Sequence, residues 1–256
     1  MADLGRLDRV DLLDLLGLGQ ALHQVDLDGA LRVAAPAEQP DCRYPEEGDL
    51  VARAVAGRRR EFLTGRNLAR AALADLGVPP GPIGRRPDRS PAWPSGVIGS
   101  ISHTDGLVAA AVARPRRPGT TGGAPERQVG LGLDTEVDQP LPEEVAARVL
   151  RADERLALGT ANTTESTVVF SAKESVFKAV NPMTGRWLEP EDVEIRLDPD
   201  GTPASGPAGS GTFEARLAMA GPDDPSLVAG RWVRLGGWVV TACVARAGRG
   251  RAVPEP

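Results

Sequence analysis

The sequence predicts an α+β protein built from two similar halves, residues 1–126 and 127–256, with a site in the cleft between them. Segments with the two-residue alternation of strands are interspersed with segments at the 3.6-residue spacing of helices. Near the end of each half a short apolar sequence is nearly repeated, as VAAAVAR at 108–114 and as VTACVAR at 240–246. A stretch rich in Pro, Gly and Thr at 114–127 separates the halves and indicates a flexible loop or a boundary.

The first half is expected to contain a short helix, a strand, one or two further helices, and two strands joined by a turn. These elements fall at residues 6–23, 30–35, 50–76, 97–102 and 107–113, with the turn at 103–106. The helical stretch is expected to end at Gly77, because two prolines follow shortly after it.

The second half is expected to open with a strand and two helices and to close with an antiparallel pair of strands. These elements fall at residues 129–136, 143–159, 163–180, 231–234 and 238–245, and residues 198–211 are expected to form a loop. Asn162 and Glu165 are spaced as in a capping box at the start of the second helix. Asn181 followed by Pro182 is expected to end that helix.

Composition restricts the class of protein. The 256 residues are 41% hydrophobic, enough for a sizeable core, and the net charge of −5 disfavours nucleic acid as a partner. The chain has no apolar run long enough to span a membrane, and its N-terminus does not resemble a secretory signal. Cys42 and Cys243 are too few and too far apart for a disulfide framework or a metal knuckle. We therefore expect a cytoplasmic protein, and the internal similarity favours a monomer.

Residues 132–136, with the sequence GLDTE, form the first candidate site. On a strand, alternate residues share a face, so Leu131 and Leu133 are expected in the core while Asp134 and Glu136 lie on the opposite face. That face also carries two glycines, which are expected to leave room for a ligand. Mg²⁺ binds carboxylates together with water and phosphate oxygens. For so short a motif, the alternative is a solvated strand end with ordinary surface acids.

A second candidate site contains the only two lysines among 30 basic residues, within FSAKESVFK at 170–178. Lysine is a compact cation whose pKa shifts on burial, whereas the planar guanidinium group of arginine stays charged. On a helix, Glu174 and Lys178 lie together at the edge of the apolar arc, and Lys173 falls inside it. Taken alone, these residues are equally well interpreted as a helix-stabilising pair and a snorkelling side chain. Combined with the acidic strand, they predict a Mg²⁺-dependent enzyme that acts on a phosphate anhydride.

The combination of G-x-D-x-E at 132–136 with F-x-x-K-E-x-x-x-K at 170–178 resembles the 4′-phosphopantetheinyl transferases. The resemblance is to the bacterial branch that activates the enterobactin and surfactin synthetases. Further motifs stand in the family's order, namely RRREFLTGR at 58–66, PAWPSG at 91–96, GSISH at 99–103 and WL at 187–188. The joint set is specific, although each piece alone is not.

The resemblance implies the 4′-phosphopantetheinyl transferase fold, with coenzyme A held between the two halves. The enzyme would move the phosphopantetheine arm onto a serine of a carrier protein and release adenosine 3′,5′-bisphosphate. The implied partners are acyl or peptidyl carrier proteins of polyketide, fatty-acid or nonribosomal peptide synthases. The residues that match the family's Mg²⁺-binding acids are Asp134, Glu136 and Glu174. Glu174 also matches the usual general base, and Lys178 matches a lysine near the pyrophosphate.

The remaining matches concern coenzyme A itself. Ser102 and His103 match positions that contact its 3′-phosphate, while Asp134 and Lys173 belong with Lys178 around the pyrophosphate. The basic residues that match the family's grip on the phosphates are Arg58, Arg66 and Arg85. Between positions 53 and 70 there are six arginines and a single acid, Glu61, in an otherwise acidic chain. A solvated basic helix is the alternative interpretation of that stretch.

Two other functions are compatible with the same residues. A Mg²⁺-dependent hydrolase of coenzyme A or of a nucleotide anhydride would release its products without any carrier protein. A non-catalytic coenzyme A-binding module would bind tightly without turnover. The presence of all three acids and both lysines favours the transferase.

Overall fold

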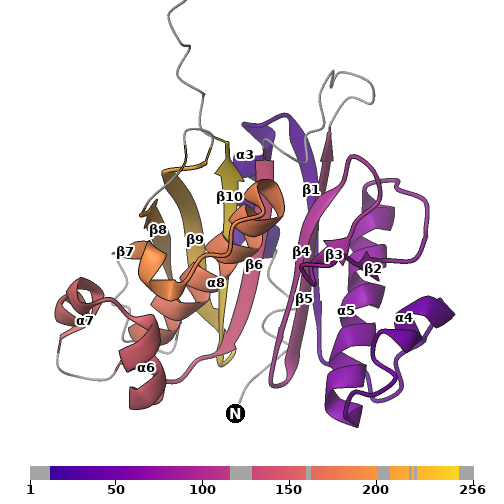
Figure 1. Ribbon diagram of the computed structural model, residues 1–256, viewed down its shortest axis with the longest axis horizontal. Coiled ribbons are helices and arrows are strands. Elements are labelled where there is room, and N and C mark those ends of the chain that lie inside the picture. The colour runs from indigo at the N-terminus through magenta and orange to yellow at the C-terminus, as the bar shows by residue number, and fades with distance from the viewer. Residues whose placement is uncertain are drawn as a thin grey trace, which may run out of the picture.

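The computed structural model describes residues 12–115, 129–159, 163–200, 208–218, 221 and 224–247. In this part of the chain, helices and strands form four layers (Figure 1). Helix α5 (Ala56–Asp75) covers a three-stranded sheet, and helix α8 (Glu165–Thr184) covers a five-stranded sheet. The two sheets face each other across a shared core, so the predicted α+β class is confirmed.

The first sheet has the order β1-β5-β4 and is antiparallel throughout. Its strands are β1 (Leu27–Ala34), β4 (Ile98–Thr104) and β5 (Leu107–Pro115). His103 and Thr104, expected in the turn, continue β4, and the turn is only Asp105 and Gly106. Gly106 has a φ of 75°, a conformation that suits glycine at this position of a tight hairpin. Helix α4 (Pro45–Asp49) and the short strands β2 (Gly84–Arg85) and β3 (Pro91–Ala92) complete this half.

The second sheet has the order β6-β10-β9-β8-β7 and is also antiparallel. Its strands are β6 (Val129–Val137), β7 (Val193–Pro199), β8 (Gly209–Leu217), β9 (Leu227–Leu235) and β10 (Trp238–Arg246). The nearly repeated sequences lie in β5 and β10. Each of these strands pairs with the first strand of its half on one side and with its hairpin partner on the other. The internal repeat is therefore a repeat of topology.

Several elements differ from the sequence expectation. Residues 50–55 are not helical, and the single helix expected at 143–159 is two short ones, α6 (Glu143–Val149) and α7 (Ala152–Leu158). The expected loop at 198–211 overlaps the ends of β7 and β8, and burial along β8 alternates as it does along β4. Asn162, the expected capping residue, and the loop residues 116–127 lie outside the described residues.

Helix α8 does not end at Pro182. It runs to Thr184 and ends at Gly185, which has a φ of 71°. A proline this close to the end of a helix removes one backbone hydrogen bond. The last turn packs against Gly130 of β6 through Ala179 and Met183, and this contact offsets the loss.

Gly130 and Gly132 of β6 bring α8 into direct contact with the sheet. They share a face with Asp134, as predicted, but the room they leave is filled by α8 and not by a ligand. A Cβ atom at Gly132 would lie 1.8 Å from the carbonyl oxygen of Ser175, and one at Gly130 would lie 1.9 Å from that of Ala179. The opposite face of β6 carries Leu131 and Leu133 into the core between the sheets, as expected. The two glycines thus set the distance between the acidic strand and the lysine-bearing helix.

The two halves are joined along β4 and β6, which lie side by side without forming a hydrogen-bonded ladder. Serine side chains make the connection. Ser100 Oγ donates to the carbonyl of Leu133 at 3.2 Å, and the amide of Thr135 donates to Ser102 Oγ at 3.2 Å. At the hairpin turns, Trp238 Nε1 donates to the carbonyl of Asp105 at 3.0 Å. Helices α2 (Leu12–Leu15) and α3 (Leu18–His23) contribute leucines to the same central core.

Among the described residues, no helix is both long and apolar enough to cross a bilayer.

We expect Gly132→Ala to destabilise the protein strongly, because its new methyl group would overlap the backbone of α8. The expected loss is more than about 2 kcal/mol in the free energy of unfolding, measured by urea denaturation. Gly57→Ala is the matched control, since a Cβ there meets nothing within 4 Å. That change in the first turn of α5 should leave stability unchanged or slightly improved. Equal stability of the two variants would contradict the close packing of β6 and α8.

Candidate active site

Asp134 is the centre of the candidate site. It lies on β6 and is 3% exposed. Its Oδ1 accepts hydrogen bonds from Ser102 Oγ at 2.8 Å and from Lys178 Nζ at 2.6 Å, and its Oδ2 accepts one from Ser171 Oγ at 2.8 Å. Ser102 comes from β4, whereas Ser171 and Lys178 come from α8. A single buried carboxylate therefore ties together three elements from both halves.

Ser102 uses its whole hydrogen-bonding capacity at this point. Its hydroxyl donates to Asp134 and accepts from Lys178 Nζ at 2.9 Å and from the amide of Thr135 at 3.2 Å. The family resemblance associates Ser102 with the 3′-phosphate of coenzyme A, and in the structure its hydroxyl is bonded within the carboxylate cluster. Its neighbour His103 projects from the other face of β4.

Glu136 and Glu174 add two half-buried carboxyl groups to this cluster. The pKa of Glu136 is raised to about 7, chiefly by burial and also by the charges of Asp134 and Glu174, against the lowering effect of Lys178. Burial and the charge of Asp134 also raise the pKa of Glu174, again against the effect of Lys178. Three carboxyl groups therefore share one neighbourhood in which Lys178 is the opposing cation.

The donor set of this cluster fits a hard divalent cation. In the described residues, no three His, Cys, Asp or Glu side chains already stand in a metal-binding arrangement. Asp134 nevertheless raises the pKa of both Glu136 and Glu174, so the three carboxyl groups lie close enough to influence one another. Carboxylate oxygens are the ligands that Mg²⁺ prefers. Binding an ion would require the side chains of the two glutamates to turn toward Asp134.

A positively charged region adjoins the cluster on the first half. His103 lies between Arg58 and Glu61 of α5, with its Nε2 against Arg58 Nη1 and its Nδ1 3.2 Å from Glu61 Oε2. The pKa of His103 is lowered to about 4, chiefly by burial and also by the charges of Arg58 and Lys178, while Asp134 opposes the shift. The structure thus brings together Arg58 and His103, two of the residues predicted to bind phosphate.

Arg66 and Arg85 occupy different positions in the same region. Arg66 is 4% exposed, and its guanidinium donates to the carbonyls of Ile83 at 2.8 Å and Gly84 at 3.1 Å. Burial lowers the pKa of Arg66 to about 10, and the charges of Arg70, Arg58 and Arg85 contribute to that shift. Arg66 therefore holds the segment that carries the exposed Arg85, and the arginines are close enough to affect one another.

Lys173 does not join the cluster around Asp134. Its Nζ lies 2.7 Å from Glu154 Oε2 of α7 and donates to the carbonyl of Pro190 at 2.8 Å. Both charged side chains are almost completely buried. Pro190 opens the short 3₁₀ helix η2 (Pro190–Asp192), so Lys173 fastens α8 to two other segments on the side away from β6. The two lysines of the motif point to opposite sides of α8.

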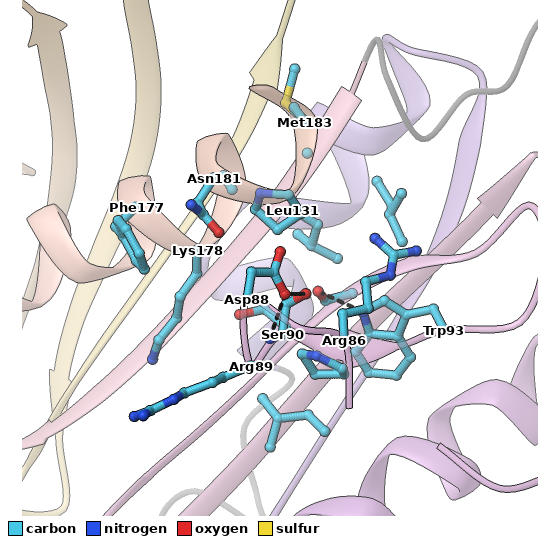
Figure 2. A pocket seen from close by; sticks show the side chains of 18 of the residues that line it. Arg86, Asp88, Arg89, Ser90, Trp93, Leu131, Phe177, Lys178, Asn181 and Met183 are labelled. Carbon is cyan, nitrogen blue, oxygen red and sulfur yellow. Dashed lines mark hydrogen bonds between the residues drawn. The ribbon is translucent and has the colours of Figure 1, made fainter. Parts of the chain in front are cut away.

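A cavity of about 290 Å³ adjoins Lys178 between the two halves. Figure 2 shows Phe177, Lys178 and Asn181 of α8 on one side of the cavity and the segment that carries Arg89 and Trp93 on the other. Most of its walls are apolar, and their floor is formed by residues of β4 and β6. Trp187 stands exposed at the edge and meets the ring of Phe177 edge-on, with ring centres 4.9 Å apart.

Sequence reasoning missed three residues that belong to these networks. Ser171 occupies an unspecified position of the motif at 170–178, Glu154 lies outside the matched motifs, and both look like ordinary helix residues. Glu61 had a visible signal, because it is the single acid in an arginine-rich stretch.

Comparison with known proteins identifies the family. Residues 46–113 match the model of the 4′-phosphopantetheinyl transferase N-terminal domain, and residues 130–234 match that of the 4′-phosphopantetheinyl transferase superfamily. The chain belongs to this superfamily. It is therefore an enzyme of the phosphopantetheinyl transferase class, a class that acts on coenzyme A and carrier proteins.

Named relatives of this transferase cover most of its length. It is 41% identical over 229 residues to 4′-phosphopantetheinyl transferase Svp of Streptomyces mobaraensis, which is 85% of each chain. It is 38% identical over 207 residues to 4′-phosphopantetheinyl transferase Npt of Nocardia iowensis, covering 78% of this chain and 87% of that one. Enterobactin synthase component D of Salmonella typhi is 33% identical over 165 residues, 63% of this chain and 62% of that one.

We expect Lys173→Met to destabilise the transferase, because it leaves Glu154 buried without its cation. Breaking a buried pair in this way typically costs about 3–5 kcal/mol in the free energy of unfolding. The matched control is Arg32→Met, which removes an ion pair between two exposed side chains, Arg32 and Asp75, and should cost less than about 1 kcal/mol. Urea denaturation measures both. A Lys173→Met protein as stable as the control would show that the pair does not support the fold.

We expect the metal-free transferase to lose stability as the pH rises from the ordinary carboxyl range toward 7. In that window the folded protein retains the proton of Glu136, whose pKa is about 7, while the unfolded chain releases it. The contribution of Glu136 to the free energy of unfolding is therefore largest below the pKa that it has in the unfolded chain. It declines as the pH rises until the pKa of the folded state is passed.

Chemical denaturation in the presence of a chelator, at several values between about pH 5 and pH 8, measures this slope. Glu136→Gln should make the decline shallower, and Glu143→Gln, at an exposed position on α6, should not. The same slope in the wild type and in Glu136→Gln would contradict the raised pKa of Glu136.

Proposed function

We propose that this chain transfers the 4′-phosphopantetheine group of coenzyme A to a serine of an apo acyl or peptidyl carrier protein. The reaction would depend on Mg²⁺ and release adenosine 3′,5′-bisphosphate. The observation that carries the proposal is the cluster in which Asp134 is bonded to Lys178 and coupled electrostatically to Glu136 and Glu174. This cluster combines the groups needed at a pyrophosphate, and it lies where the two halves meet.

The residues that would hold the metal are Asp134, Glu136 and Glu174. When bound, Mg²⁺ would neutralise charge on the pyrophosphate oxygens of coenzyme A. The raised pKa values of both glutamates support this assignment, because a nearby divalent cation would favour their ionised forms.

Glu174 is the proposed general base. The serine hydroxyl of the carrier protein would form a bond to the β-phosphorus of coenzyme A, and its proton would pass to Glu174 directly or through one water. The bond from that phosphorus to the bridging oxygen would break, leaving the charge on adenosine 3′,5′-bisphosphate. A carboxylate whose pKa is raised by burial is a better base than an exposed one. Lys178 would offset the charge on the departing oxygen.

Coenzyme A would extend from the arginine-rich region into the cleft. Arg58, Arg85 and His103 would contact its 3′-phosphate, and Arg66, which donates to the carbonyls of Ile83 and Gly84, would support the segment that carries Arg85. The cavity next to Lys178 would receive the pantetheine arm, whose gem-dimethyl group suits its apolar walls. The carrier proteins would be those of polyketide, fatty-acid or nonribosomal peptide synthases, and the enzyme would act as a cytoplasmic monomer.

The decisive experiment incubates the purified protein with coenzyme A, Mg²⁺ and an apo carrier protein and measures the carrier's mass. We expect a mass increase equal to one phosphopantetheine, which a chelator prevents and added Mg²⁺ restores. Glu174→Gln should lower the rate by about 10²-fold or more, because the amide cannot accept the serine proton. Glu165→Gln, at the start of the same helix, is the matched control and should transfer at the wild-type rate.

Each other outcome has a distinct meaning. Hydrolysis of coenzyme A without a carrier would indicate the hydrolase. Tight binding without turnover on several carriers would indicate a binding module. A fully active Glu174→Gln variant would show that Glu174 is not the general base.

A further inference from the structure

Glu61 is a charged residue at the candidate site that lies within the RRREFLTGR motif at 58–66 but has no role in the proposed chemistry. It lies one turn after Arg58 on α5, and its side chain is 25% exposed. Its Oε2 is 3.2 Å from His103 Nδ1 and 3.6 Å from Arg58 Nη1. The carboxylate thus contacts two residues expected to bind the 3′-phosphate, although a negative charge there would repel a phosphate.

The hydrogen-bond partners of His103 fix the position of its proton. An arginine can only donate, so the ring nitrogen that faces Arg58 must be an acceptor and carries no hydrogen. A carboxylate can only accept, so the nitrogen that faces Glu61 must carry one. The neutral ring is therefore the tautomer with hydrogen on Nδ1, and its Nε2 presents a lone pair.

This tautomer is unsuited to bind phosphate as it stands. The lone pair of Nε2 would face an anionic oxygen, and exchanging the proton between nitrogens would leave Glu61 opposite a second lone pair. The only state that satisfies both Glu61 and a phosphate is the imidazolium ion, which donates from both nitrogens.

We propose that Glu61 is a positioning residue that directs His103 Nε2 toward the 3′-phosphate of coenzyme A and makes its binding proceed with uptake of a proton. The proton comes from solvent and adds to Nε2 as the phosphate takes the place of the Arg58 contact. This inference rests on the proposed function, because it assumes that coenzyme A is the ligand.

The charges around the ring agree with proton uptake on binding. The charged groups facing His103 are Arg58 and Glu61 from α5, Lys178 from α8 and Asp134 from β6. Without ligand, burial and the two cations keep the ring neutral near pH 7, since the pKa of His103 is lowered to about 4. A phosphate at Nε2 would reverse this balance by drawing Arg58 to itself and adding negative charge next to the ring.

The test compares coenzyme A with dephospho-coenzyme A, which lacks only the 3′-phosphate, by titration calorimetry in buffers of different ionisation enthalpy. Mg²⁺ is present throughout, so any proton exchange at Glu136 or Glu174 is common to both ligands and cancels in the difference. We expect more protons to be taken up when coenzyme A binds than when dephospho-coenzyme A binds. The difference should approach about one proton per site as the measurements are made at more acidic pH. The affinity advantage of coenzyme A should fall as the pH rises, because the complex holds the extra proton.

Two variants separate positioning from a merely structural role. Glu61→Gln can accept from or donate to Nδ1, so neutral His103 can carry its hydrogen on Nε2. That variant should retain coenzyme A binding but lose most of the difference in proton uptake. Glu61→Ala should weaken coenzyme A binding by roughly tenfold and leave dephospho-coenzyme A within about twofold. The control is Asp75→Asn, which changes an exposed acid at the far end of α5. It should alter neither the affinity nor the proton uptake for either ligand.

Equal proton uptake for the two ligands in the wild type would overturn the inference while leaving the transfer function intact. So would a proton difference unchanged in Glu61→Gln. Failure of the wild type to bind either ligand would instead count against the proposed function.

Discussion

The buried carboxylate of Asp134 is the constraint on which the arrangement of this site depends. A nearly fully buried carboxylate needs both hydrogen-bond donors and a cation. Here the donors come from Ser102 on one half and Ser171 on the other, and Lys178 supplies the cation. The two sheets form no backbone ladder where they meet, so these side-chain bonds also hold β4 against β6. Stability of the joint and placement of the reactive groups therefore depend on the same few atoms.

The sequence predicted most of the fold because the pattern of each buried strand is local. Leu131 and Leu133 of β6 alternate with glycines, whereas the repeated strands β5 and β10 are short continuous apolar runs, and the structure confirms all three as strands. The extra strands β7 and β8 were missed because turn-type residues between them suggested a loop, although Val193, Ile195 and Leu197 alternate as a strand should. The end of α8 was also misplaced. Proline has a strong local effect, but packing of the last turn onto β6 decides where this helix ends.

The site was predictable in its residue types and less so in the directions of its side chains. Asp134, Glu136, Glu174 and Lys178 lie in one neighbourhood, because a strand and a helix each place residues of fixed spacing on one face, and their binding of a metal stays a prediction. The direction of Lys173 depends on Glu154, whose approach comes from a separate helix that no spacing rule connects to it. Arg66 is likewise turned inward by the carbonyls of Ile83 and Gly84. Tertiary partners of this kind leave no periodic signal.

The two halves present opposite charges at their joint, and this has a consequence for the proposed reaction. The first half contributes the arginines of α5 and His103, whereas the second contributes three carboxyl groups and Lys178. A monoester phosphate can bind the first set directly. A pyrophosphate placed against the second set would be repelled by more negative charge than Lys178 offsets. Under the proposed function, a divalent cation is therefore needed to bring the pyrophosphate to the carboxylates at all, and coenzyme A and metal are expected to strengthen each other's binding. This mutual enhancement depends on the three carboxyl groups of the second half. Neutralising Glu136 should therefore weaken the coupling between metal binding and coenzyme A binding while leaving the contacts to the 3′-phosphate in place.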